Sequence, residues 1–87
     1  MKRTTNQGVI DAFIAKSEEP VHSHNQNLRY TPWYGKALIN YRTIIAKWEG
    51  ETVLFDERKY SRTTSKIQTQ LRNSLTKAGI QTGPLDH

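Results

Sequence analysis

The sequence predicts an α+β fold in which an N-terminal helix, an antiparallel β-hairpin or three-stranded sheet, and a C-terminal helix form a two-layer sandwich. Two helical stripes of apolar residues flank a central stretch rich in β-branched and aromatic residues, which is the pattern of such a fold. The chain has 87 residues, enough for one hydrophobic core. We therefore expect a single α+β domain over residues 1–80 and a flexible tail over residues 81–87.

The first predicted helix covers residues 4–18. Thr4 and Gln7 have the spacing of a capping box, and Pro20 prevents the helix from continuing. The apolar stripe of this helix consists of Val9, Ile10, Phe13 and Ile14. This stripe is narrow, so we expect the helix to lie across a sheet.

A polar segment and a short strand follow the first helix. Residues 19–27 show no hydrophobic period, which predicts a loop. Leu28–Tyr30 predicts a short strand that Pro32 ends or confines to the sheet edge. An exposed edge at this strand would permit pairing between subunits.

The central stretch predicts a hairpin. Ala37–Trp48 and Thr52–Tyr60 are rich in β-branched and aromatic residues, and Glu49-Gly50 supplies a turn. A two-residue loop at Glu49-Gly50 would place Ile44 opposite Phe55. In the same register, the charged side chains would form the pairs Arg42 with Glu57 and Tyr41 with Arg58.

A second helix is predicted over Lys66–Ala78. Ser65 and Gln68 have capping-box spacing, and Gly79 stands where a glycine ends many helices. The predicted core face of this helix consists of Ile67, Leu71, Leu75 and Ala78.

Composition narrows the protein class. The chain has no cysteine, which excludes disulfides and thiolate metal sites and is typical of a reducing compartment. No apolar run approaches the roughly 20 residues of a membrane span, and no signal-peptide region follows the start, so we expect a cytoplasmic protein without a membrane partner. His22 and His24 lack the further ligands that zinc requires, so we expect neither a metal nor another cofactor.

The most informative feature is an acid-free, basic segment over Arg58–Lys77, in a chain of net charge +5. Arg62 and Lys66 lie at the predicted helix start, where acidic residues are usually favoured. Cations, hydroxyls and free amide groups together favour phosphate or carboxylate. The candidate anion-binding residues are Arg58, Lys59, Arg62, Thr63, Thr64, Ser65, Lys66, Arg72 and Lys77. An ordinary structural role is the alternative, because Ser65 can simply cap the helix and the cations can be solvated.

Aromatic residues would refine this site. If Tyr30, Trp33 and Tyr34 are exposed near the cations, they would stack on bases of single-stranded nucleic acid. Core packing is the alternative for all three side chains. The expected partner is thus nucleic acid, DNA or RNA, or else an acidic protein surface.

Catalysis is not expected. Glu57-Arg58-Lys59 matches the acid-x-Lys ending of many metal-dependent nuclease strands, but the pattern is short and the predicted register pairs Glu57 with Arg42. No serine–histidine–acid set and no phosphate-cradling glycine loop is present in the sequence. The sequence therefore favours a binding protein over an enzyme.

Three segments resemble a widespread group of small uncharacterised bacteriophage proteins. They are Leu28–Tyr30, Leu38–Ala46 and Lys59–Gln68, the last reading KYSRTTSKIQ where the group has "KYS-TTSK-Q". The resemblance implies a phage or prophage origin and expression in a bacterial host cytoplasm, but no activity. A weaker analogy links the order of elements to the double-stranded-RNA-binding domain, which also places a basic helix start on phosphates.

Together these observations predict a small phage accessory protein that binds nucleic acid through a basic strand-to-helix surface. The alternative is an inhibitor that binds host transcription or defence machinery. Tyr30, Trp33, Tyr34 and Trp48 would then be its anchoring side chains.

Overall fold

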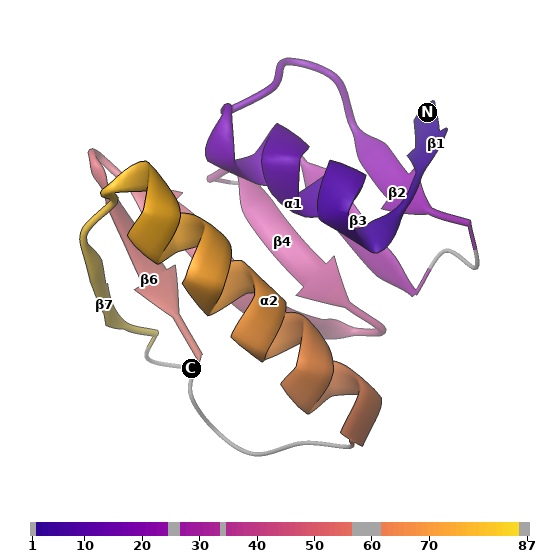
Figure 1. Ribbon diagram of the computed structural model, residues 1–87. Coiled ribbons are helices and arrows are strands. Elements are labelled where there is room, and N and C mark those ends of the chain that lie inside the picture. Colours follow the sequence, from indigo (N-terminus) through magenta and orange to yellow (C-terminus); the bar gives the residue numbers. More distant parts are fainter. Residues whose placement is uncertain (1, 25–26, 34, 57–61, 86–87) are drawn as a thin grey trace.

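The computed structural model describes residues 2–24, 27–33, 35–56 and 62–85, with Lys2 and Thr63 described by their backbone alone. In this part of the chain, seven strands form one sheet and two helices pack on it (Figure 1). The strands are β1 Lys2–Thr4, β2 Val21–Ser23, β3 Leu28–Thr31, β4 Ala37–Asn40, β5 Thr43–Glu49, β6 Thr52–Phe55 and β7 Thr82–Pro84. The helices are α1 Asn6–Ile14 and α2 Arg62–Ala78.

The strands lie in the sheet in chain order, but the pairing is mixed. β1 and β2 are parallel and are joined by α1, while β6 and β7 are parallel and are joined by α2. Between these two β-α-β units, β2 to β6 form an antiparallel meander. The two units run in the same direction, so crossovers of the same hand place both helices on one face of the sheet, as Figure 1 shows.

This sheet corrects the predicted fold: a hairpin or three-stranded sheet is wrong. β2 lies within the predicted polar loop, and β7 lies within the predicted flexible tail. The strand predicted at Leu28–Tyr30 exists, but it is interior, paired with β2 on one side and β4 on the other, so it offers no free edge. The mixed seven-stranded sheet also differs from the fold of a double-stranded-RNA-binding domain.

The predicted hairpin differs in two respects. The run Ala37–Trp48 is two strands, because the chain reverses at Tyr41 and Arg42 between β4 and β5. The next turn falls at Gly50-Glu51, so Ala46 rather than Ile44 pairs with Phe55. Tyr41 and Arg42 therefore lie in a turn, and not on the strand that the predicted pairs Arg42 with Glu57 and Tyr41 with Arg58 required. Glu57 and Arg58 lie outside the described residues.

A β-bulge shapes the middle of β5. The register between β4 and β5 shifts at Leu38 and Ile39, which leaves one extra residue on β5. As a result Ile45 and Ala46 are both buried although they are consecutive, and Ile44 is exposed on the face without helices.

The helix boundaries also differ from the prediction. α1 begins after Thr5, whose hydroxyl accepts a hydrogen bond from the Gly8 amide at 3.1 Å, so Thr5 rather than Thr4 caps it. α2 begins at Arg62, which places Ser65 inside the helix and makes the predicted capping box wrong. The predicted end at Gly79 is confirmed: Gly79 has φ 71°, its amide binds Thr76, and the Ile80 amide binds the Leu75 carbonyl.

The core lies between the helices and the sheet. α2 contributes Ile67, Leu71 and Leu75 as predicted, whereas Ala78 is exposed. The ring of Phe13 packs edge-to-face on Tyr30, with centroids 6.1 Å apart, and Trp48 donates its indole N–H to the Phe13 carbonyl at 2.7 Å. The remaining buried apolar residues are Val9, Ile10, Val21, Leu28, Ala37, Leu38, Ile45, Ala46, Val53 and Phe55.

Tyr30 is bound within this core. Its hydroxyl donates to the Ser17 carbonyl at 2.7 Å, and its side chain is only 1% exposed. Burial, with a smaller contribution from Glu18, raises the pKa of Tyr30 above its ordinary value. Neither helix of the described chain is long and apolar enough to cross a membrane.

Candidate nucleic-acid interface

The exposed glutamates of the described chain lie toward one end of the sheet, among several lysines. The β5–β6 turn carries Glu49 and Glu51, and the segment after α1 carries Glu18. Two lysines of the described chain neutralise part of this acidic end: Lys16 lies 3.8 Å from Glu51, and Lys36 lies 3.7 Å from Glu18. These exposed acids therefore lie away from the β4–β5 turn and the start of α2.

Four exposed cations occupy the other end, which we call the basic end: Arg29 on β3, Arg42 in the β4–β5 turn, and Arg62 and Lys66 on the first turns of α2. Among the described residues, the acidic side chain at this end is that of Asp56, and it is 1% exposed. Asp11 lies more than one turn into α1, where its carboxylate accepts a hydrogen bond from Gln7 at 2.8 Å. Positive charge thus dominates the part of this surface that the described residues form.

Buried hydrogen bonds join α2 to the β4–β5 turn. The Thr64 hydroxyl donates to the Asn40 side-chain oxygen at 2.6 Å, and the Asn40 side-chain nitrogen donates to the Asn27 carbonyl at 3.2 Å. The Tyr41 amide donates to the same carbonyl at 2.7 Å. Because Thr64 and Asn40 are buried, these bonds hold the first turn of α2 against the strand that leads into the turn.

Among the described residues, Tyr41 is the exposed aromatic residue of the basic end. Its side chain is 49% exposed, and its φ of 56° lies in the left-handed region that favours glycine. An L-residue pays about 1–2 kcal/mol for this conformation, and a bulky side chain there is uncommon. A shallow hollow surrounds it, lined by Asn27, Arg29, Tyr41, Arg42 and Thr43.

Two neighbours fix the position of Tyr41. The Arg29 guanidinium donates to the Tyr41 carbonyl at 3.2 Å, and the Asn27 side-chain nitrogen donates to the Tyr41 hydroxyl at 3.3 Å. The backbone and the hydroxyl of Tyr41 are therefore both held by hydrogen bonds, and Arg29 lines the same hollow as the ring.

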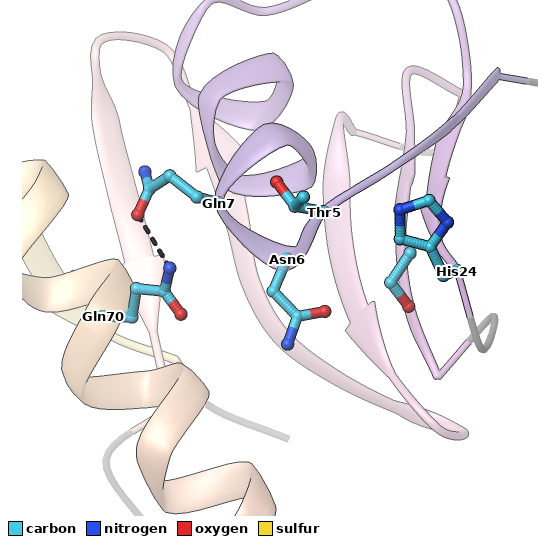
Figure 2. A pocket seen from close by; sticks show the side chains of 6 residues that line it. Thr5, Asn6, Gln7, His24 and Gln70 are labelled. Carbon is cyan, nitrogen blue, oxygen red and sulfur yellow. Dashed lines mark hydrogen bonds between the residues drawn. The ribbon is translucent and has the colours of Figure 1, made fainter.

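A second hollow lies where α1 begins, between the end of β2 and α2 (Figure 2). Its labelled side chains are Thr5, Asn6, Gln7, His24 and Gln70, and the Gln70 amide donates to Gln7 at 2.8 Å. It extends the basic end with hydrogen-bonding groups that carry no negative charge. In the described chain, no three histidine or acidic side chains cluster to hold a metal ion.

The structure brings together part of the predicted anion site. Arg62 and Lys66 are exposed on the same face of α2, four residues apart. Lys77 is exposed but lies at the other end of the helix, about 22 Å from Arg62 along the helix axis. The Arg72 guanidinium lies 5.5 Å from the ring of Phe55, which places it on the side of β6.

Three predicted hydroxyls contribute differently. Thr64 is buried in its bond to Asn40, so it cannot bind a ligand, and Ser65 is half-buried within the helix. Arg58, Lys59 and the side chain of Thr63 lie outside the described residues.

The predicted aromatic contacts need correction. Tyr30 is buried, so it offers no ring face to a base. Trp33 is 58% exposed but lies between β3 and β4, at the end of the sheet opposite Tyr41. Tyr34 lies outside the described residues, and Trp48 is held in the core by its bond to Phe13.

Sequence reasoning missed Tyr41, Arg42 and Arg29 as one group. The available signal was the polar interruption Asn40–Thr43 within an otherwise apolar run. Comparisons of the chain with protein-family models, curated proteins and solved structures find no match.

Proposed function

We propose that this protein binds nucleic acid through the basic end, as an accessory protein of a bacteriophage in the host cytoplasm. The observation that carries the proposal is the separation of charge. Exposed cations from three elements gather at the basic end, where the acidic residue among those described, Asp56, is buried. The exposed glutamates of the described chain lie at the opposite end of the sheet, where lysines offset them. A polyanion is the partner that such a surface attracts most strongly.

The chemistry of the basic end supports binding rather than catalysis. Arg29, Arg42, Arg62 and Lys66 offer N–H donors and positive charge, which suit phosphate oxygens. Asn27 adds an amide group that can bind phosphate or sugar oxygens. The phage setting is supported by the resemblance of Lys59–Gln68 to small bacteriophage proteins, and it forms part of the proposal.

Binding should be tested by fluorescence anisotropy with labelled DNA and RNA over a range of salt concentrations. Neutralised phosphates release counterions, so the affinity of the wild-type protein should fall steeply as salt rises. The double variant Arg62→Glu with Lys66→Glu should bind at least ~30-fold more weakly and show a salt dependence shallower by about two units of slope.

The matched control is the double variant Lys47→Glu with Lys77→Glu. It changes the net charge by the same amount, but both lysines lie away from the basic end, so only the general attraction should weaken. Equal losses of affinity in the two double variants would show that no local site exists.

A second experiment distinguishes the alternative function. The protein should be used to capture partners from a bacterial lysate treated with nuclease. A stoichiometric protein partner that survives this treatment, together with the absence of nucleic-acid binding in the anisotropy assay, would contradict the proposal and favour an inhibitor of a host protein.

A further inference from the structure

We infer that the basic end binds single-stranded nucleic acid by stacking an unpaired base on the ring of Tyr41. This inference rests on the proposed function and names its substrate class. It starts from the ring itself, which is 49% exposed on a surface that otherwise carries cations and amides.

The backbone of Tyr41 provides the first argument. The residue stands in a two-residue turn between β4 and β5 with φ 56°, a position where glycine or asparagine is the least strained choice. The ring makes no contribution to the core, because it points away from the buried cluster. A strained, exposed aromatic residue at a binding surface is a feature that function explains better than stability does.

The surroundings of the ring provide the second argument. Arg29 and Arg42 line the same hollow, and the Arg29 guanidinium is fixed to the Tyr41 carbonyl at 3.2 Å. A base stacked on the ring would leave its phosphates near these two cations, while Asn27 and Thr43 can bind its polar edge. Aromatic platforms beside a basic groove are the usual means of holding single strands.

The geometry also disfavours a duplex at this position. A base within a double helix is stacked on both faces and cannot reach a protruding ring without being turned out of the stack. Arg62 and Lys66, in contrast, can contact the phosphates of either form. The expected preference for single strands therefore arises at Tyr41 and not at α2.

The test compares a labelled single-stranded oligonucleotide with the duplex of the same sequence. Tyr41→Gly suits the left-handed backbone, so the variant should fold, as a thermal melt would show. It should bind the single strand about 5- to 150-fold more weakly, the range that loss of one stacked base produces, and leave duplex binding unchanged. Tyr41→Phe keeps the ring but loses the bond from Asn27, so it should retain most of the single-strand affinity that Tyr41→Gly loses.

Trp33→Gly is the matched control, since it removes the exposed aromatic side chain at the opposite end of the sheet, and its single-strand affinity should not change. If Tyr41→Gly binds single strands as well as the wild type does, the stacking inference is wrong. If the wild type binds both forms equally and only the Arg62 and Lys66 reversal matters, the inference fails while the proposed function stands. Absence of binding to either form overturns both.

Discussion

The buried bond between Thr64 and Asn40 makes a quantitative prediction about stability. Thr64→Val keeps the shape and the β-branch of the side chain, so the helix propensity hardly changes. It removes a 2.6 Å hydrogen bond and leaves the Asn40 oxygen buried without this donor. Leaving a buried acceptor without its donor costs about 1–3 kcal/mol, so we expect the free energy of unfolding to fall by about 2 kcal/mol.

Urea unfolding followed by circular dichroism measures this change in free energy. In a thermal melt, the melting temperature of a domain of this size should fall by about 8–16 °C. Thr69→Val is the matched control: Thr69 is exposed on the same helix, its hydroxyl binds only the Ser65 carbonyl of the preceding turn, and the change should be below about 0.5 kcal/mol.

A double-mutant cycle with Asn40→Leu isolates the bond itself. The double variant should lose less free energy of unfolding than the two single variants lose in sum, and the difference should exceed about 0.5 kcal/mol. The reason is that neither polar group of the Thr64–Asn40 bond is then left without the other. If Thr64→Val is no more destabilising than Thr69→Val, or if the cycle shows no coupling, the bond does not anchor α2 to the β4–β5 turn.

Two further predictions concern the core and a helix end. Tyr30→Phe removes the bond to Ser17 and should cost about 1 kcal/mol near neutral pH. Because burial raises the pKa of Tyr30 in the folded state above the 10.0 of the unfolded chain, the wild-type free energy of unfolding should fall as pH rises above about 10. The difference in this free energy between the wild type and Tyr30→Phe, measured by urea unfolding, should narrow over the same range. A constant gap would refute this. Gly79→Ala forces alanine to φ 71° and should lower the free energy of unfolding by about 1–2 kcal/mol, as a thermal melt would show. Gly83→Ala is the control, because its new methyl group meets only Leu54 at 3.6 Å and should have little effect. Equal effects of the two changes would contradict the role of Gly79.

The long, periodic elements of the fold were predictable from sequence, and the short strands were not. α2 carries a sustained apolar stripe and ends at Gly79, so its core face and its end follow from local rules. β1, β2 and β7 have three residues each, too few to display an alternating pattern. They exist because neighbouring strands pair with them and because α1 and α2 return the chain to the sheet, which are tertiary effects.

The candidate site shows the same division. Arg62 and Lys66 stand out as cations in an acid-free segment, so their exposure could be predicted. The turn at Tyr41 was harder to predict, because an aromatic residue in a run that also contains Ile39 and Thr43 indicates an extended strand, and the polar neighbours of Tyr41 were the sign of a turn with positive φ. The turn at Gly50 was misplaced by one position since glycine fits either place in a two-residue loop.

The two β-α-β units also orient the helices alike: α1 and α2 both begin at the end of the sheet toward which β4 points (Figure 1). Each helix start carries a partial positive charge from its peptide groups, equivalent to about half an elementary charge. Neither helix has an acidic residue in its first turn to offset it. The backbone itself therefore contributes to the potential at the basic end, and a weak attraction for anions should persist when the side-chain charges there are neutralised rather than reversed.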